Sequence, residues 1–413
     1  MKALILTIGD ELLIGQVVNT NAASISQQLN GAGVEVVRQL TVGDELPEIL
    51  RALGEGVAQC DAVVVTGGLG PTHDDITKKA LCTFFETDLV SSPDVRRCIE
   101  RFLAQRSQPW TAASEEQTLV PRGSTVILNH HGTAPGALFE RAGKCVFAMP
   151  GVPYEMEYMM KDFVLPYLRS RAGTAAIVHR NLRTTGIPES VLAARLGSIE
   201  EMLEGARLAF LPSSGGVRLR ISVVDNDRAR AEARAMEVER RIREKAEEFI
   251  YASGDEEIEE TVGGLLAERG LTIALAESCT GGLVSHRLTN VPGSSRYLLG
   301  SVVAYSNASK QAILGVSGEL FRTRGAVSQE VAVAMAEGAR GVCGASVGLS
   351  TTGIAGPSGG TPEKPVGLVW IGYADGTRSF ARKFTMGGER VRIKERASQS
   401  ALDLVRRTLL GLP

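Results

Sequence analysis

The stretch LTIALAESCTGGLVSHRL, residues 271–288, indicates the fold class of the chain. An apolar run of strand type ends at Glu277, and a helical pattern resumes after a polar turn that contains two glycines. The first part of the chain repeats this alternation, with strand-like runs at 3–8, 34–40 and 61–68 separated by helix-like runs. Strands that alternate with helices form βαβ units around parallel sheets with helices on both faces. The sequence therefore predicts an α/β protein.

Changes in composition divide the 413 residues into three expected domains. Strand and helix patterns alternate over residues 1–170, which predicts a parallel-sheet domain. A small α+β module with a long charged helix fills residues 171–253, and a second α/β domain fills residues 254–413. About 150 residues per domain is common, and this division fits that size.

Charge and cysteine usage narrow the classes of function. The formal net charge is −2, which gives no support for binding nucleic acid through a basic surface. The six cysteines lack CxxC spacing, which argues against a zinc site or a disulfide framework and fits a reducing compartment. No apolar run approaches the roughly 18 residues of a membrane span, and the first one is too short for a signal peptide. We expect a cytoplasmic protein without a membrane partner.

Two candidate nucleophiles, Ser278 and Cys279, lie at the turn in the opening stretch. A serine needs a base, and His286 is a poor one because its position on the helix places it roughly 12 Å up the axis. Lys310 follows the next strand, and a buried lysine with a lowered pKa can accept the proton of a serine hydroxyl. Tyr305, at the end of that strand, could relay or orient the proton. Cys279 has no evident cation or histidine beside it, so we expect a small buried residue.

The turn after Ser278 and a later glycine-rich loop are candidate anion sites. We expect free main-chain amides at Thr280, Gly281 and Gly282, which would suit a phosphate or an oxyanion. The alternative is that Ser278 or Thr280 only caps the helix. The loop STTGIAGPSGGTPEKPVG, residues 350–367, offers further amides and hydroxyls, with a purely structural loop as the alternative. The hydroxyls belong to Thr351 and Thr352, and the arginines that could add positive charge are Arg390 and Arg392.

A second candidate site follows the strands of the first domain. Gly67, Gly68 and Gly70 lie between a buried strand and a helix, where they can admit a pyrophosphate, although the spacing is neither a P-loop nor GxGxxG. Several carboxylates lie in loops at the same expected edge of the sheet, and together they suggest a Mg²⁺-like ion that bridges to a pyrophosphate. A helix cap or a surface position is the alternative for each of them. These carboxylates are Asp10, Glu11, Asp44, Asp74 and Asp75.

The last domain contains the motifs AESCTGG, VPGSS, GSVVAYSNASK, GAVSQEVAVAMAEGAR and TTGIAGPSGGTPEKPVG. They resemble the C-terminal domain of the CinA family, which is similar to bacterial nicotinamide mononucleotide (NMN) deamidases. The resemblance implies hydrolysis of NMN to nicotinate mononucleotide and ammonia, with no metal or other cofactor. The family's serine, tyrosine and lysine fall on Ser278, Tyr305 and Lys310. The family's threonine and arginine of the site would fall on Thr352 and Arg392. Together with the turn amides and the glycine-rich loop, the predicted substrate-binding residues of this domain are Thr280, Gly281, Gly282, Thr352, Gly353, Gly356 and Arg392.

The first domain contains the motifs GDELLIGQVVNTN, TGGLGPTHDDIT, NHHGTAPG and MPGVPYEM. They resemble the N-terminal domain of the same family, which is related to molybdopterin-binding proteins. The resemblance implies a pyrophosphatase that cleaves ADP-ribose to AMP and ribose 5-phosphate with a divalent metal such as Mg, Mn or Co. The five carboxylates above would be the metal ligands, and the nucleotide would lie against Gly67, Gly68, Gly70 and Asn19.

The middle module resembles the KH-like insertion of the family. Its SSGG sequence, residues 213–216, lies between two strands and not between helices, as the GXXG loop of an RNA-binding KH domain should. We therefore predict no binding of nucleic acid. The resemblance further implies a homodimer. Two alternatives stay open: a molybdopterin- or nucleotide-binding protein without turnover in the first domain, and a competence-related interaction protein.

Overall fold

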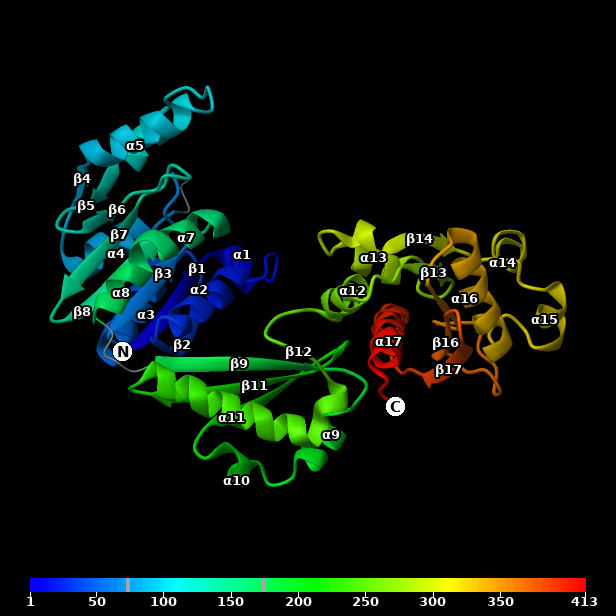
Figure 1. Ribbon diagram of the computed structural model, residues 1–413. Helices are drawn as coiled ribbons and strands as arrows, with labels where there is room; N and C mark the ends of the chain where they lie inside the picture. The colour runs from blue at the N-terminus through cyan, green and yellow to red at the C-terminus, as the bar shows by residue number, and fades with distance from the viewer. Residues whose placement is uncertain (72–74, 172–175) are drawn as a thin grey trace. The chain divides into compact units, whose positions relative to one another are not determined.

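The computed structural model describes residues 1–71, 75–171 and 176–413, and it confirms the α/β prediction (Figure 1). In this part of the chain, no helix combines the length and the apolar character needed to cross a membrane. The chain forms two compact units, and each is described by itself. The units are Met1–Val178 with Val224–Glu232, and His179–Val223 with Ala233–Pro413.

The first unit contains a six-stranded sheet with a hydrophobic core on each face. Alternate residues of a strand point to opposite faces, so Ile5 and Val64 join one core whereas Leu4 and Val63 join the other. The first four strands across the sheet are parallel, and the last two are antiparallel to their neighbours. The order is β2 (Glu35–Val42), β1 (Lys2–Ile8), β3 (Ala62–Thr66), β8 (Lys144–Met149), β7 (Gly136–Arg141) and β6 (Thr125–Ile127).

Helices cover both faces of this sheet, as the βαβ pattern predicts. Their buried residues divide between the two cores, which assigns each helix to one face. A small two-stranded ribbon with its own helices completes the unit. One face carries α2 (Thr20–Gly31), α7 (Pro153–Met159) and α8 (Leu165–Arg171), and the other carries α3 (Leu46–Gln59) and α4 (Thr77–Phe85). The small part comprises β4 (Leu89–Ser91), α5 (Pro93–Ala104), α6 (Ala112–Gln117) and β5 (Leu119–Pro121).

The second unit contains most of the expected α+β module. Its four-stranded sheet has the order β10-β11-β9-β12, and the long charged helix α11 runs along it in Figure 1. The SSGG turn joins two strands, as predicted, because β10 ends at Ser213 and β11 begins at Gly216. The elements are β9 (Ala176–Thr184), α9 (Glu189–Leu196), α10 (Ile199–Leu203), β10 (Arg207–Ser213), β11 (Gly216–Asp225), α11 (Arg228–Ala246) and β12 (Ile250–Ser253).

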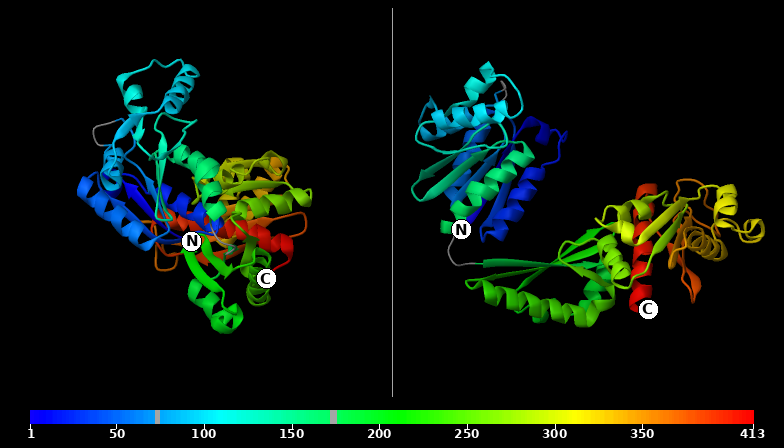
Figure 2. Two further views of the ribbon diagram at one scale, coloured as in Figure 1. Left: turned by 90° about the vertical axis from the view of Figure 1, so that its left-hand side faces the viewer. Right: turned by 45° about the horizontal axis from the view of Figure 1, so that its top comes forward.

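The same unit contains the last sheet, whose order is β14-β13-β15-β16-β17. The strand β13 is parallel to both neighbours, so the turns that follow β13 and β14 lie at one edge. Figures 1 and 2 show α17 on one face and α14 to α16 on the other, in agreement with two separate cores. The strands are β13 (Ile273–Glu277), β14 (Leu298–Val303), β15 (Val347–Gly353), β16 (Leu368–Ala374) and β17 (Ser379–Thr385). The helices are α12 (Ile258–Glu268), α13 (Leu283–Thr289), α14 (Asn307–Leu314), α15 (Gly318–Thr323), α16 (Gln329–Cys343) and α17 (Arg390–Leu410).

The packing of α16 on β15 depends on a glycine, which gives a test of this fold. A Cβ atom at Gly348 would lie 2.0 Å from the carbonyl oxygen of Ala336, so a methyl group must push the helix away from the strand. We expect Gly348→Ala to lower the free energy of unfolding by about 2 kcal/mol, measured by chemical denaturation. The control is Gly264→Ala in α12, where a Cβ meets open space; it should raise the free energy of unfolding by about 0.5–1 kcal/mol. Equal effects of both substitutions would contradict this packing.

Candidate active sites

Ser278 and Lys310 form a buried pair at the edge of the last sheet. Ser278 directly follows β13, and Lys310 lies in the first turn of α14, which follows the parallel strand β14. The Lys310 Nζ donates a hydrogen bond to the Ser278 Oγ at 3.1 Å. Only 2% of Lys310 is exposed, and this burial lowers the pKa of its amine below the ordinary value of 10.5. A lowered pKa favours the neutral amine, which is the form that can accept a proton.

A buried carboxylate, that of Glu277, holds the turn around this pair. Its oxygens accept main-chain hydrogen bonds from Gly282, Val284 and Ser285 at 2.9, 3.1 and 2.8 Å. These amides belong to the start of α13, where main-chain N–H groups have no acceptor within their own helix. A negative charge at a helix N-terminus is further stabilised by the helix dipole. The last residue of β13 therefore fixes where α13 begins and how the turn between them runs.

The structure corrects two expectations about this turn. The amides of Gly281 and Gly282 are not free, since the first donates to the Ser278 carbonyl at 3.1 Å and the second to the carboxylate described above. Among these three amides, that of Thr280 donates to no acceptor in the described part of the chain, and the residue is buried. Neither a serine nor a threonine of the turn caps α13, whose N-cap is Gly282, so the capping alternative is wrong as well.

Cys279 is not a reactive thiol in this structure. It is 6% exposed and belongs to the hydrophobic core beneath α12, α13 and α17. Burial raises the pKa of its thiol to about 12, so the thiol stays protonated at neutral pH. The expectation of a small buried residue is confirmed. His286, the other group considered beside Ser278, is exposed on α13.

Tyr305 pairs with an arginine and not with the serine–lysine pair. It is 61% exposed, and its hydroxyl accepts a hydrogen bond from the Arg390 Nη2 at 2.7 Å. The Arg390 Nη1 donates to the carbonyl oxygen of Gly356 at 2.6 Å, which ties the glycine-rich loop to α17. Arg392 is exposed and makes no hydrogen bond or ion pair with the described residues. The geometry therefore favours Arg390 over Arg392 as the cation beside the loop.

Two further residues of the glycine-rich loop region serve packing. The Thr352 hydroxyl is buried and donates to the carbonyl oxygen of Ala326 at 2.8 Å. A Cβ atom at Gly353 would lie 2.7 Å from the carbonyl oxygen of Leu368, so the neighbouring strand approaches closely there. The roles of Thr352 and Gly353 in binding a substrate stay predictions.

Lys394 is a cation that the sequence analysis missed. It lies on α17, one turn after Arg390, and a Cβ atom at Gly281 would lie 3.7 Å from its Nζ. Its ammonium group is therefore close to the turn that follows Ser278. The signal in the sequence was the spacing of four residues between Arg390 and Lys394, which places both on one face of a helix.

The glycines and most carboxylates predicted for the first domain line one cleft of about 900 Å³. The cleft lies at the carboxyl ends of the parallel strands, where ligands of open α/β sheets bind. The main-chain amides of Asp10 and Asp44 each donate to the carboxylate of the other residue, at 3.0 and 3.2 Å. Asp74 lies outside the described residues. The predicted residues that line the cleft are Asp10, Glu11, Asn19, Asp44, Gly67, Gly68, Gly70 and Asp75.

Two residues that line this cleft have a buried polar atom without a partner. Among the described residues, neither the Asn21 Oδ1 nor the Gln117 Nε2 has a hydrogen-bond partner. Among the described residues, no three His, Cys, Asp or Glu side chains gather in a way that could hold a metal ion. A divalent metal would therefore have to take part of its coordination from a bound phosphate, as Mg²⁺ commonly does.

Glu155 is an acidic wall residue that the sequence analysis quoted only within the motif MPGVPYEM. It lies in the first turn of α7 and is 8% exposed. The Asn129 Nδ2 donates to its carboxylate at 2.6 Å, and burial raises its pKa. The proline at residue 153 predicts the start of a helix and therefore places Glu155 in its first turn, but the sequence does not predict that this side chain is buried.

The fold and the two sites define a multidomain α/β protein. The probable molybdopterin binding domain family matches residues 4–170, the damage-inducible protein CinA KH domain family matches residues 179–252, and the CinA C-terminal domain family matches residues 255–409. A CinA-like protein of Salinibacter ruber is 45% identical over 99% of this chain and 100% of its own length. A putative competence-damage inducible protein of Caldicellulosiruptor saccharolyticus is 42% identical over 100% of both chains. The chain belongs to the CinA family.

Solved structures resemble parts of the chain. A CinA protein of unknown function from Thermoplasma acidophilum is 36% identical over 40% of this chain and 95% of its own, with a TM-score of 0.37. The molybdopterin biosynthesis enzyme MoaB from Thermus thermophilus is 23% identical over 41% of this chain and 95% of its own, with a TM-score of 0.29.

Removal of the Glu277 carboxylate tests its role at the turn. We expect Glu277→Ala to lower the free energy of unfolding by about 2 kcal/mol or more, because three buried or partly buried amides lose their acceptor. The measurement is denaturant unfolding of the full chain, with Glu268→Ala at the exposed end of α12 as the control. A loss no larger than that of the control would mean that the carboxylate does not hold the turn.

Proposed function

We propose that the last domain hydrolyses the carboxamide of NMN to release ammonia. The observation that supports this most strongly is the 3.1 Å contact between the Lys310 Nζ and the Ser278 Oγ, in a site that lowers the pKa of the lysine. A hydroxyl next to a neutral amine is the arrangement of a serine nucleophile with a lysine base. The choice of NMN rests on the resemblance of the surrounding motifs to the deamidase domain.

In the proposed reaction, the Ser278 Oγ attacks the carboxamide carbon and its proton passes to the Lys310 Nζ. The Thr280 amide would donate to the oxyanion of the tetrahedral intermediate. The C–N bond then breaks, and Lys310 returns the proton to the departing ammonia. Lys310 then takes a proton from water as the water oxygen attacks the acyl-serine ester. The ester C–O bond breaks, the lysine gives this proton to the Ser278 Oγ, and nicotinate mononucleotide leaves. Arg390 and Lys394 would attract the phosphate of the substrate.

The first domain has a separate proposed activity, the hydrolysis of ADP-ribose to AMP and ribose 5-phosphate. The Asn21 Oδ1 and the Gln117 Nε2 belong to residues that line its cleft and have no hydrogen-bond partner among the described residues, which supports a polar ligand there. In the described part of the chain, Asp10, Asp44 and Asp75 do not gather into one metal site, so a divalent cation would take its ligands from one or two of them and from the pyrophosphate, whose charge it would neutralise when bound. Glu155, whose pKa is raised by burial, would take a proton from the attacking water. Binding of a molybdopterin-type ligand without turnover is the alternative for this domain.

Replacement of Lys310 tests the proposed deamidation. We expect Lys310→Met to reduce ammonia release from NMN by about 10²- to 10⁴-fold, the usual loss for a missing general base. Lys310→Arg should not restore it, because a guanidinium stays protonated in proteins. In the wild type, activity should rise with pH through the lowered pKa of Lys310 and then level off, since only the neutral amine accepts the proton. Full activity of a folded Lys310→Met protein would contradict the proposal.

Removal of the metal by a chelator, or substitution of a proposed metal ligand, should stop AMP release and leave ammonia release unchanged. We expect EDTA to stop AMP release from ADP-ribose and to leave ammonia release from NMN intact. Asp75→Asn should lower AMP release by about 10²-fold or more, since it removes a charge at the proposed metal. The control is Asp94→Asn, an exposed residue on α5 outside the cleft. Wild-type protein that binds ADP-ribose without releasing AMP would favour the carrier alternative.

A further inference from the structure

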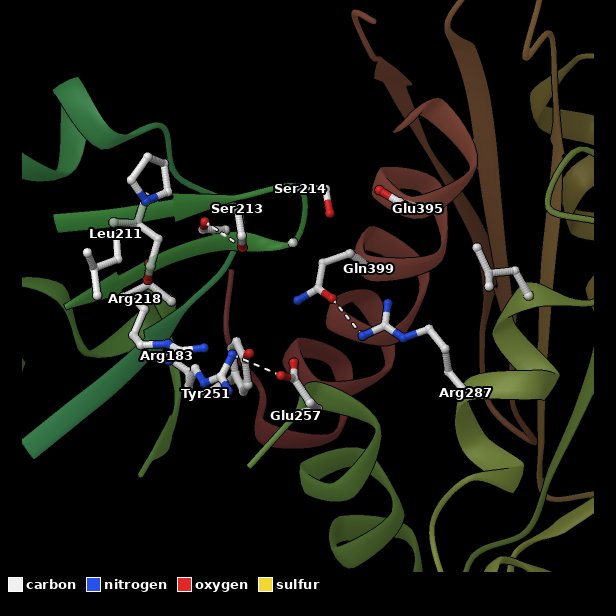
Figure 3. Close-up of a pocket in the computed structure, with 16 residues that line it drawn as sticks. Arg183, Leu211, Ser213, Ser214, Arg218, Tyr251, Glu257, Arg287, Glu395 and Gln399 are labelled. Carbon is white, nitrogen blue, oxygen red and sulfur yellow. Dashed lines mark hydrogen bonds and ion pairs between the residues drawn. The ribbon is translucent and has the colours of Figure 1, made fainter. Parts of the chain in front are cut away.

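A second cleft, of about 570 Å³, lies within the second unit (Figure 3). One wall comes from the hairpin of β10 and β11 in the KH-like sheet, and the other comes from α13 and α17. Cavities of this volume commonly bind small molecules. Neither Ser278 nor Lys310 lines it, so it is separate from the proposed deamidase site.

One wall of this cleft is held by a hydrogen-bonded network. Arg287 on α13 donates to the Glu259 carboxylate at 2.6 Å and to the Gln399 Oε1 at 2.8 Å, the second contact being drawn in Figure 3. The Gln399 Nε2 in turn donates to the Thr185 hydroxyl at 3.3 Å, which ties α17 to the end of β9. Gln399 is only 5% exposed. A wall with its side chains fixed in this way is preorganised for a ligand.

Two charges that face this cleft are unpaired. Arg218 on β11 and Glu395 on α17 make no hydrogen bond or ion pair with any residue that the structure describes, and Figure 3 shows them on opposite sides of the cleft. Arg183 is paired with Glu257 at 2.9 Å, and its buried Nε has no acceptor among the residues that the structure describes. The aromatic ring of Tyr251 lines the same space. The cleft thus offers a cation on one wall, an anion on the other and an aromatic surface.

We propose that this cleft binds a mononucleotide that has a phosphate at one end and a positively charged ring at the other. The phosphate would lie against the guanidinium groups of Arg218 and Arg183, because guanidinium groups match phosphate geometry. The cationic ring would lie toward Glu395. A pyridinium nucleotide has this charge pattern, and the choice of that ring rests on the proposed deamidation.

The same cleft shares two helices with the proposed deamidase site. Its walls include α13, whose first turn is held by Glu277 beside Ser278. They also include α17, in which Glu395 directly follows Lys394. The two proposed sites are therefore neighbours in the second unit, but different residues line them.

Calorimetric titration of NMN into the full-length Ser278→Ala protein tests this site without turnover. We expect two classes of binding, one of which weakens about ten- to hundredfold when Arg218→Ala is added. The matched control is Arg220→Ala, two residues along the same strand, exposed and outside the cleft. An Arg218→Ala isotherm that coincides with the control would overturn the proposal.

A comparison of AMP with NMN tests the same cleft if Arg218→Ala fails to fold. AMP has the phosphate without a cationic ring, so it should bind the second cleft less tightly than NMN does. In Glu395→Gln that preference should disappear. An unchanged preference in a folded Glu395→Gln protein would overturn the assignment of the ring. Because these titrations measure binding alone, they can succeed or fail whether or not the wild type releases ammonia.

Discussion

The contact between Lys310 and Ser278 constrains the whole last domain, because a lysine that is almost fully buried must be neutral or paired. Among the described residues, no carboxylate forms an ion pair with Lys310, and burial is the main cause of its lowered pKa. The lysine reaches the serine only because β13 and β14 are parallel and end at one edge. Close packing then fixes α14, since a Cβ atom at Gly338 in α16 would lie 2.1 Å from the carbonyl oxygen of Leu314. The contact between Ser278 and Lys310 thus depends on the parallel strands of the sheet and on the packing of α14 against α16.

The cleft of the first unit also lies where parallel strands end, but different side chains line it. Parallel strands end at one edge, and the loops after them bring glycines and carboxylates together around about 900 Å³. Here the polar residues are spread along a larger space and not joined in one buried contact. This difference fits two different proposed reactions: attack by a protein hydroxyl in the last domain, and attack by water on a charged pyrophosphate in the first.

The sequence was sufficient for the α/β class, the turn between β10 and β11, and the choice of Lys310 over His286 beside Ser278. These followed from periodicity, from the order of strands and helices, and from the reach of a helix. The state of the turn amides could not be predicted, because it depends on where the Glu277 carboxylate points. The contact of Arg390 with Tyr305, and the position of Lys394 near Gly281, depend on the rotation of α17 against the sheet. Such details come from tertiary packing, which local patterns do not encode.

The second cleft adds a link between the KH-like module and the last domain. The network of Arg287, Gln399 and Thr185 joins the two by side chains, and the buried Arg406 adds a hydrogen bond to the carbonyl oxygen of Glu248 at 2.8 Å. These contacts explain why the KH-like sheet and the last domain fall in one compact unit. The KH-like module thereby forms one wall of the second cleft.

The measurement that tests the central claim most directly compares the two adjacent candidate nucleophiles. Ammonia release from NMN would be followed for the wild type, Ser278→Ala and Cys279→Ala, all with EDTA present and with folding checked by circular dichroism. We expect release by the wild type and by Cys279→Ala, and none by Ser278→Ala. Release by a folded Ser278→Ala protein would contradict the assignment of Ser278 as the nucleophile, and loss in Cys279→Ala alone would transfer that role to the cysteine.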